Sequence, residues 1–329
     1  MDMLQEKVLY ILEKNKGKVV TGGEISRQLG VSRNAVWKAI NSLKKSGNKI
    51  ESLSNRGYRV AFDNDSLCRQ IIQEMLTTER LGSTIELLET IHSTNTYIKE
   101  QDPGKLQEGH VVLADEQTGG RGRLNRPFFS PKGSGIYLSV LLKPVLSPEK
   151  TRLLTICAAV AVSKALQSVC GLTPRIKWVN DIFVEGKKIC GILTEASISA
   201  EMQSLNYVIV GIGINTGEIP EEVEEIATSV LEVTGKKGFR NRLAVEVLNQ
   251  LEKIYLEDLL PGNESEILSA YSERLIYIKE KVLVKMYDDS FEATVLGIDG
   301  TGSLIVKNDE GQVLHINTGE IFAKPQVDI

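Results

Sequence analysis

The stretch at residues 111–128 has the sequence VVLADEQTGGRGRLNRPF. Its first four residues are apolar and are typical of a buried strand. Three glycines and three arginines follow within eight positions. Glycine lets the backbone turn its N–H groups toward a ligand, and arginine offers a planar fork that matches phosphate or carboxylate groups. Taken alone, the stretch fits an anion-binding loop and a flexible surface loop equally well.

The composition around this stretch is that of an ordinary globular protein, with 42% hydrophobic and 25% charged residues in 329. This length predicts two or three domains. The four cysteines and three histidines are scattered, which predicts no disulfide framework, no metal cluster built from protein ligands and a reducing, cytoplasmic location. The N-terminus lacks a signal-peptide pattern, and the most apolar segment, residues 153–166, looks too short and too polar to span a bilayer.

The net charge of −4 conceals an uneven distribution. Residues 1–62 hold 12 basic and 5 acidic residues, a balance of +7, whereas the remainder holds 27 basic and 38 acidic residues, a balance of −11. A basic head on an acidic body indicates that the head meets nucleic acid.

The head shows the pattern of three helices followed by a hairpin. Thr21 and Glu24 match a capping box that starts the second helix, Gly30 ends that helix, and Ser32 can cap a third helix only two residues later. This short spacing is typical of a helix-turn-helix. A hairpin with its turn at Gly57 follows, as in a winged helix.

The outer face of the third helix and the tip of the hairpin are polar and basic. Such side chains bind base edges and phosphates in the major groove. An alternative is a protein-interaction unit with a solvated basic face. The candidate DNA-binding residues are Arg33, Asn34, Lys38, Asn41, Lys45 and Arg56.

Two further stretches of the central region carry polar residues with a possible chemical role. Residues 93–95 (Ser-Thr-Asn) open a short helix, where they can be simple caps or can bind a polar ligand. Residues 175–193 predict a strand, a turn at Glu185-Gly186 and a second strand. Lys188 lies among apolar neighbours, so it needs an anionic partner, which is either Asp181 or a ligand.

The remaining segments carry less chemical information. The strand at residues 207–215 contains glycines that allow close approach, but it does not match a dinucleotide fingerprint. Residues 218–229 are acidic and irregular, as expected of a mobile cover. From residue 281 the pattern changes to short strands at 282–286, 291–298, 303–306 and 313–316, which predict an SH3-like barrel.

The chain resembles the bifunctional biotin–protein ligases that also act as biotin operon repressors. The resemblance rests on five motifs in order behind a winged helix: Ser93-Thr94-Asn95, Gly120-Arg121-Gly122-Arg123, Lys177-Trp178-x-Asn180-Asp181, Lys187-Lys188-x-x-Gly191-Ile192-Leu193 and Gly211-x-Gly213-Ile214-Asn215. It implies an α+β multidomain chain. Its expected parts are a winged helix-turn-helix over residues 1–63, a mixed-sheet catalytic domain like that of class II synthetases over 64–277, and an SH3-like β-barrel over 278–329.

The resemblance also implies an activity. The chain is expected to convert biotin and ATP, with Mg²⁺, to biotinyl-5′-AMP and pyrophosphate. It would then transfer biotin to a lysine of a biotin carboxyl carrier protein, in acetyl-CoA carboxylase or pyruvate carboxylase. With biotinyl-5′-AMP bound, it would repress biotin biosynthesis and transport genes as a homodimer on operator DNA. Two alternatives remain: a ligase for lipoate or octanoate, and a transcription factor that only binds an effector.

Site residues follow from the same motifs. Lys188, Arg121 and Arg123 are the expected catalytic residues, and Asp181 is either a catalytic or a structural partner. The residues expected to bind biotin are Ser93, Thr94, Asn95, Gln117, Arg121, Gly122, Arg123, Lys188 and Gly191. Those expected to bind the adenylate are Gly120, Arg121, Arg123, Lys188, Asn180 and Asn215.

The chain departs from the commonest family pattern at Leu124-Asn125, Phe128 and Val179. Asn125 can take the place of a glycine because asparagine tolerates left-handed backbone angles. The glycine- and arginine-rich loop is expected to be mobile without ligand and ordered by biotinyl-5′-AMP.

Overall fold

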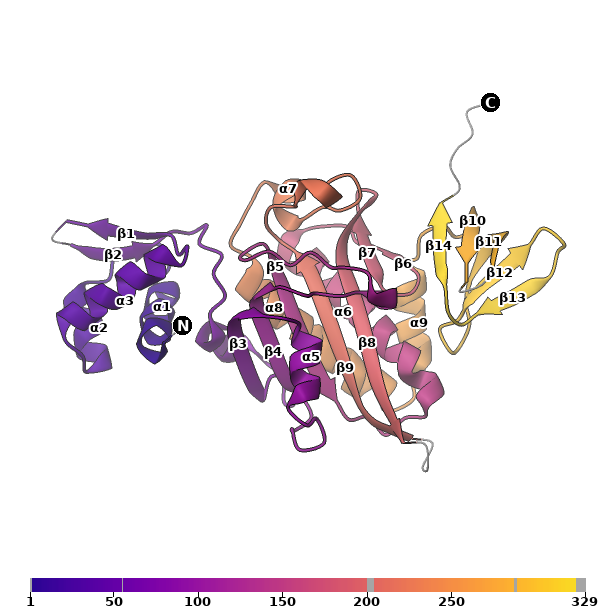
Figure 1. Cartoon of the computed structure of the whole chain (residues 1–329), viewed down its shortest axis with the longest axis horizontal. Coiled ribbons are helices and arrows are strands. Elements are labelled where there is room, and N and C mark those ends of the chain that lie inside the picture. Colours follow the sequence, from indigo (N-terminus) through magenta and orange to yellow (C-terminus); the bar gives the residue numbers. More distant parts are fainter. Residues whose placement is uncertain (1, 55, 200–203, 287–288, 324–329) are drawn as a thin grey trace.

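Three β-sheets organise the protein, as the computed structural model shows for residues 2–54, 56–199, 204–286 and 289–323 (Figure 1). A small N-terminal head lies at one end, a large mixed sheet forms the centre, and an antiparallel sheet lies at the other end. The α+β architecture predicted from the sequence is therefore confirmed.

The head forms the predicted helix-turn-helix and hairpin. Thr21 and Glu24 make both hydrogen bonds of the capping box, and Gly30 ends the second helix with a left-handed φ of 67°. The side chain of Ser32 caps the third helix by accepting a hydrogen bond from the backbone N–H of Ala35. The elements are α1 (Met3–Lys14), α2 (Gly22–Leu29), α3 (Arg33–Lys45), β1 (Ile50–Leu53) and β2 (Gly57–Val60).

The head contacts the body through α1, which packs against α4 (Arg69–Met75). Glu6 on α1 forms an ion pair of 2.9 Å with Arg69, and the hydroxyl of Tyr10 donates to Glu74 over 2.9 Å. Helix α3 packs on α1, α2 and β1 within the head, and the polar residues Asn34, Lys38 and Lys45 on it remain exposed.

The central sheet has seven strands in the order β3-β4-β5-β9-β8-β7-β6, and only β3 and β4 run parallel. All eight residues of β5 are buried, as expected for a strand covered on both faces. The strands are β3 (Thr84–Ile91), β4 (His110–Gln117), β5 (Gly135–Leu142), β6 (Arg175–Lys177), β7 (Asp181–Val184), β8 (Lys187–Ser199) and β9 (Ser204–Asn215).

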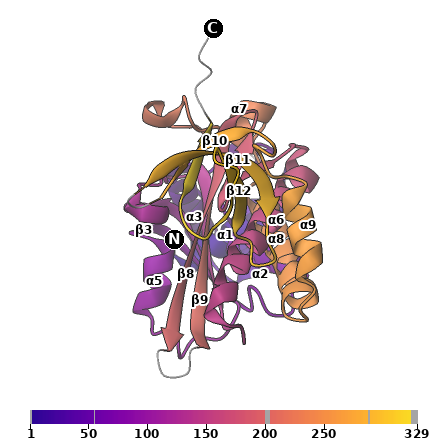
Figure 2. The same ribbon diagram turned by 90° about the vertical axis from the view of Figure 1, so that its right-hand side faces the viewer.

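Helices cover both faces of this sheet (Figure 2). The short helix α5 (Thr94–Glu100) packs on one face, against β4, β5 and β9. On the other face lie α6 (Thr151–Cys170), α8 (Arg240–Lys253) and α9 (Glu264–Ser272). Shorter helical segments complete the chain: η1 (Arg123–Asn125), η2 (Pro148–Lys150), η3 (Glu221–Val223), α7 (Val230–Thr234) and the π-helix η4 (Ile254–Leu259).

The expectation that the apolar segment of α6 is too short and too polar to span a bilayer was wrong. Together with its preceding turn, this helix runs from Pro148 to Cys170 and is long and apolar enough to cross a membrane by length and composition. However, 72% of its most apolar 18-residue stretch is buried inside the fold, where the helix packs on β8, β9 and α8. The apolar residues are explained by this packing, because a helix that is hydrophobic nearly all round is typical of a protein core.

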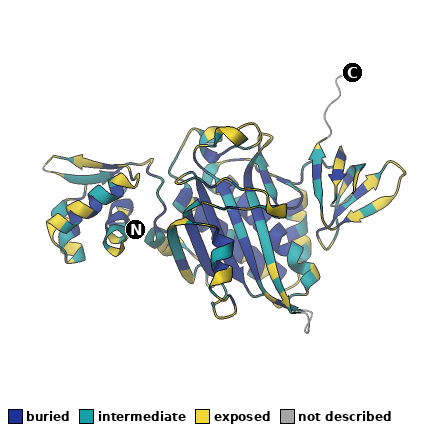
Figure 3. Ribbon diagram, in the orientation of Figure 1, coloured by how far each residue is buried: buried dark blue, intermediate teal, exposed yellow. Residues whose placement is uncertain are grey.

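The C-terminal sheet has five antiparallel strands in the order β13-β12-β11-β10-β14, one more than the sequence pattern predicted. Buried residues of this sheet and of the central sheet belong to one apolar cluster. Figure 3 shows buried positions in both sheets. The indole N–H of Trp178 also donates to the carbonyl of Gly302 over 3.0 Å. The strands are β10 (Lys281–Lys285), β11 (Ser290–Ile298), β12 (Leu304–Asn308), β13 (Val313–Ile316) and β14 (Glu320–Ala323).

Candidate functional site

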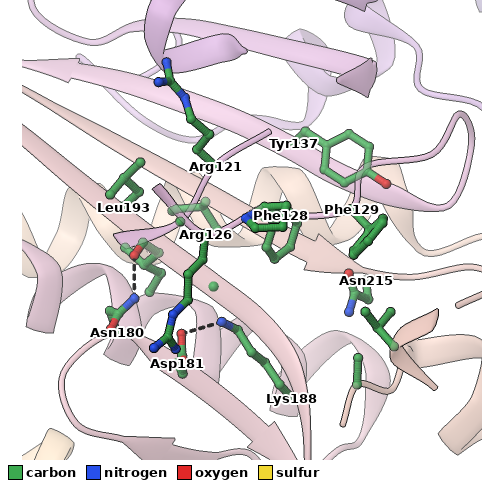
Figure 4. A pocket seen from close by; sticks show the side chains of 18 of the residues that line it. Arg121, Arg126, Phe128, Phe129, Tyr137, Asn180, Asp181, Lys188, Leu193 and Asn215 are labelled. Carbon is green, nitrogen blue, oxygen red and sulfur yellow. Dashed lines mark hydrogen bonds and ion pairs between the residues drawn. The ribbon is translucent and has the colours of Figure 1, made fainter. Parts of the chain in front are cut away.

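A cavity of about 540 Å³ lies where the central sheet meets the glycine- and arginine-rich loop. Its walls come from the start of α5, residues 121–134, the hairpin of β7 and β8, strand β9, residues 218–227 and strand β14. Figure 4 shows the polar side chains that surround it. The size is within the range of small-molecule and cofactor sites.

One end of the cavity is built by the start of α5. Ser93 acts as a helix cap, since its hydroxyl accepts a hydrogen bond from the backbone N–H of Thr96. The backbone N–H of Thr94 donates to the side-chain oxygen of Gln117 over 2.9 Å. The amide of Asn95 donates to Glu195 over 2.8 Å. Ser93, Thr94 and Asn95 are all buried, so their polar groups are held in fixed positions at the cavity wall.

Glycines on β9 provide room in the cavity floor. A Cβ atom at Gly211 would lie 2.4 Å from the side-chain oxygen of Asn95, and one at Gly213 would lie 2.4 Å from the ring of Phe128. Any other residue at these positions would displace the polar end or the aromatic wall. The glycines of this strand therefore let the side chains of Asn95 and Phe128 pack closely against it.

The glycine- and arginine-rich loop folds back over the cavity. Arg121 donates to the hydroxyl of Thr96 over 3.2 Å, and Arg123 donates to the side-chain oxygen of Asn180 over 3.3 Å. Asn125 has a φ of 56°, in agreement with the expectation that it replaces a glycine. Leu124 has a φ of 55° as well, a conformation that non-glycine residues adopt infrequently.

Gly120 is the one expected adenylate residue that does not border the cavity. Its carbonyl accepts a hydrogen bond from the backbone N–H of Phe128 over 2.9 Å. A Cβ atom there would lie 2.6 Å from the carbonyl oxygen of Phe128. The glycine is therefore needed to fold the loop back on itself. The other expected biotin and adenylate residues all line the cavity.

The predicted continuous strand at residues 175–184 was wrong. Strand β6 ends at Lys177, residues 178–180 form a turn, and β7 starts at Asp181, so that Lys177 and Asp181 are register partners. The turn is held by tertiary contacts that have no local sequence signal. The amide of Asn180 donates to the carbonyl of Ile192 over 2.9 Å, and Tyr271 donates to the carbonyl of Val179 over 3.2 Å.

Lys188 and Asp181 form an ion pair inside the cavity, and Figure 4 shows their side chains pointing toward one another. The ammonium nitrogen lies 2.7 Å from the carboxylate, and the side chains are 33% and 25% exposed. The acidic partner that the sequence offered for Lys188 is thus Asp181, and Lys188 also lines the cavity. Its backbone pairs with Ala227 of the acidic segment, which lies at the cavity mouth.

Lys177 lines the cavity, although the sequence motifs predicted no binding or catalytic role for it. Its ammonium nitrogen lies 4.7 Å from the ring centre of Phe322 and 5.8 Å from that of Phe183. Burial lowers its pKa, and the nearby carboxylates of Asp181 and Glu320 offset part of that effect. Within the described ranges it has no carboxylate closer than 4 Å, so it is a partly desolvated cation that lacks an ion-pair partner.

The C-terminal sheet also contributes to the cavity, which the sequence did not indicate. Glu320 on β14 forms an ion pair of 2.6 Å with Arg126, and Arg123 donates to the carbonyl of Gly319 over 3.2 Å. The loop is thus attached to a strand almost 200 residues further along the chain. The position of Lys177 among apolar residues could have indicated that it lines a site, whereas no feature of the sequence indicated this for Glu320.

The expected DNA-binding residues belong to the head, which lies at the end of the protein away from β7 and β8 (Figure 1). They occupy the outer side of α3 and the tip of the hairpin. All are exposed except Asn41, which is partly exposed: Arg33, Asn34, Lys38, Asn41, Lys45 and Arg56.

Comparisons with known proteins match each part of the chain. Residues 87–215 match the model of the biotin/lipoate A/B protein ligase family, residues 4–59 match an HTH domain, and residues 278–323 match the biotin protein ligase C terminal domain.

The chain is also similar over most of its length to curated proteins. It is 34% identical to the bifunctional ligase/repressor BirA of Bacillus spizizenii, over 94% of this chain and 95% of that protein. It is 27% identical to BirA of Escherichia coli, over 89% of each chain. Among solved structures, the biotin protein ligase of Aquifex aeolicus in complex with biotin and ATP is 29% identical, with a TM-score of 0.63, over 73% of this chain and 98% of that chain.

Proposed function

The chain belongs to the family of bifunctional biotin–protein ligase/repressors, and we propose that its cavity is where ATP adenylates biotin and that its head represses transcription. The observation that carries the ligase function is the placement of cations in the cavity. Lys188, Lys177 and Arg123 border one cavity whose other end carries the fixed polar groups of Ser93, Thr94 and Asn95.

The reaction needs this arrangement. The biotin carboxylate attacks the α-phosphate of ATP, forming biotinyl-5′-AMP and releasing pyrophosphate. Two anions have to approach each other, so fixed cations are required to offset their repulsion and the charge that develops. Lys188 and Arg123 are the proposed partners of the carboxylate and the α-phosphate, and Lys177 is the proposed partner of the outer phosphates. Arg121 would complete the cover over the biotin end.

Asp181 would hold the ammonium of Lys188 in place until the substrate anions arrive. The mixed anhydride is sensitive to water, and the loop over residues 119–128 would exclude water from the cavity. A lysine of a biotin carboxyl carrier protein then attacks the anhydride carbonyl. This forms an amide and releases AMP.

Mg²⁺ would enter with the nucleotide. The described residues include no group of three or more His, Cys, Asp and Glu side chains placed to hold a metal ion. This fits Mg²⁺, which is commonly held by substrate phosphates and water with few protein ligands. The ion would neutralise phosphate charge alongside the cations of the cavity.

The repressor function would use a homodimer that forms when biotinyl-5′-AMP is bound. One edge of the central sheet is closed, since Ile176 of β6 pairs with residues 274–276. The other edge is β3, which pairs with β4 on one side and with no further strand in the described part of the chain. An open strand edge of this kind is suited to pairing with a second copy. Sedimentation with and without biotin and ATP tests this.

The remaining assignments follow the same proposal. We place the winged helix at residues 1–63, the catalytic unit at 64–277 and the SH3-like unit at 278–329. The acceptor would be the carrier domain of acetyl-CoA carboxylase or pyruvate carboxylase. All four cysteines are free, which fits a reducing cytoplasm.

Transfer to a carrier domain tests the ligase function. The protein is incubated with ATP, Mg²⁺, a biotin carboxyl carrier domain and biotin, lipoate or octanoate in turn. Mass spectrometry should show a biotinyl adduct on one lysine of the carrier domain. Modification by lipoate or octanoate alone would assign the chain to another acid, and no modification with any acid would contradict a ligase.

A further inference from the structure

A large aromatic side chain on α3 stands outside the core of the head. Trp37 is 54% exposed. The neighbouring residues Val36, Ile40 and Leu43 are fully buried and face the other helices. An indole combines a large apolar area with a polar N–H and is enriched at interfaces, so an exposed tryptophan within a polar surface is a candidate contact for a partner.

The position of Trp37 relates it to the basic surface of α3. At 3.6 residues per turn, it lies one turn after Arg33 and one turn before Asn41. On the same side of the helix, two turns further on, Lys44 donates to Ser52 on β1 over 2.8 Å. Trp37 therefore lies between the polar outer face of α3 and the side that meets the hairpin.

The body of the protein does not cover this side of α3. The head contacts the body where α1 packs against α4, whereas α3 packs on α1, α2 and β1 within the head (Figure 1). The surface around Trp37 is polar and cationic, because Arg33, Asn34 and Lys38 are all exposed. A partner that offers both negative charge and an apolar contact fits this surface, and double-stranded DNA offers both.

We propose that Trp37 contacts a thymine methyl group in the major groove and so contributes to the choice of DNA sequence. This inference rests on the proposed repressor function and adds a residue to it. Arginine and lysine contacts with phosphates position a protein but carry little sequence information, whereas apolar contact with the thymine methyl does. Trp37 would add an apolar base contact to the polar base and phosphate contacts of its neighbours.

The test uses the full chain with biotin, ATP and Mg²⁺. DNA duplexes are first selected from a random-sequence pool by the wild-type protein, and each thymine of the selected duplex is then replaced in turn by uracil, which lacks the methyl group. At one position the wild type should lose about fourfold in affinity, the value of one buried methyl group. W37A should bind the original duplex more weakly and should show no loss at that position.

The two tryptophans of the chain give a second readout. Trp178 is 3% exposed, so Trp37 is the exposed emitter. The selected duplex should change the fluorescence of the wild type and not that of W37F. F62A is the matched control, since Phe62 is 77% exposed and lies after the hairpin, and it should behave as the wild type. Circular dichroism and biotin transfer report whether each variant is folded.

The outcomes separate the inference from the repressor function. If the wild type enriches no DNA, both are overturned. If it enriches DNA but folded W37A and W37F bind it with unchanged affinity and unchanged uracil sensitivity, the inference alone is overturned. If W37A alters self-association without DNA and leaves DNA binding intact, Trp37 belongs to a protein contact and the inference is again overturned.

Discussion

The ammonium of Lys188 lies 2.7 Å from the carboxylate of Asp181 at the wall of the central cavity. The pair is partly exposed on both sides, so it contributes little to the stability of the fold, about 1 kcal/mol or less. Its position is better explained by function. A lysine held by one carboxylate is oriented before an anionic substrate arrives and can then interact with the substrate.

Replacing Lys188 by alanine should abolish most of the adenylation activity. Removal of a single charge-stabilising donor from an active site costs about 100- to 1,000-fold in rate. The measurement is biotin-dependent exchange of labelled pyrophosphate into ATP. The matched control is K187A, because the adjacent side chain donates to the carbonyl of Glu224 and does not line the cavity. Near-normal exchange by a folded K188A protein would refute the role of this lysine.

Lys177 should impose a pH dependence on ATP binding. Burial lowers the pKa of Lys177, so the ammonium loses its proton at a lower pH than an exposed lysine does. The KM for ATP should therefore rise as the pH increases through this lowered pKa, and the KM for biotin should stay constant. K177R keeps its charge and should not show the rise, whereas K177Q should have a raised KM for ATP at every pH, by roughly tenfold.

A purely structural role of Lys177 would give a different pattern. In that case both variants would be less stable, and the KM values for ATP and for biotin would change in parallel. Thermal unfolding of K177R and K177Q, measured beside their kinetics, distinguishes the two cases.

The glycine- and arginine-rich loop should become protected when the adenylate forms. Trypsin can cut after Arg121 and Arg123 but resists cutting after Arg126, which precedes Pro127. Biotin and ATP together should slow cleavage at both sites severalfold, and cleavage after Arg56 in the head serves as the internal control. E320Q should speed cleavage without ligand, because the ion pair of Glu320 with Arg126 holds the loop. Cleavage rates that do not respond to biotin and ATP would argue against a cover over the intermediate.

The head should bind DNA with a salt dependence set by its exposed cations. The double substitution of Lys38 and Arg56 by alanine should weaken binding and reduce the slope of log K against log salt concentration by about two, near 0.9 for each phosphate contact. K7A on α1 is the control, since Lys7 is exposed on a different helix. Unchanged affinity and slope in the double variant would mean that DNA does not contact these two residues.

Local patterns in the sequence predicted much of the fold. The capping box of Thr21 and Glu24, the turn at Glu185-Gly186 and the apolar strands each depend on residues close in the chain, and each is found in the structure. The turn at residues 178–180 was missed because its contacts come from Ile192 and Tyr271, which are distant in sequence.

The site likewise has residues that local sequence motifs predicted and residues that only distant contacts bring to it. Most of the expected residues border one cavity, because each motif follows or begins a strand or helix that the sheet brings to the same place. The contributions of Lys177, Glu320 and Phe322 required the packing of the C-terminal sheet against the loop. No local pattern around Glu320 distinguishes it from the other exposed acidic residues of the chain.

The proposed adenylation of biotin is tested most directly by the exchange of labelled pyrophosphate into ATP. The purified protein is assayed with biotin, with lipoate, with octanoate and without any acid. We predict exchange that requires biotin and Mg²⁺ and that is absent with the other acids. The absence of exchange with biotin, in a folded protein that binds ATP, would contradict the assignment of the cavity as the site where biotin is adenylated.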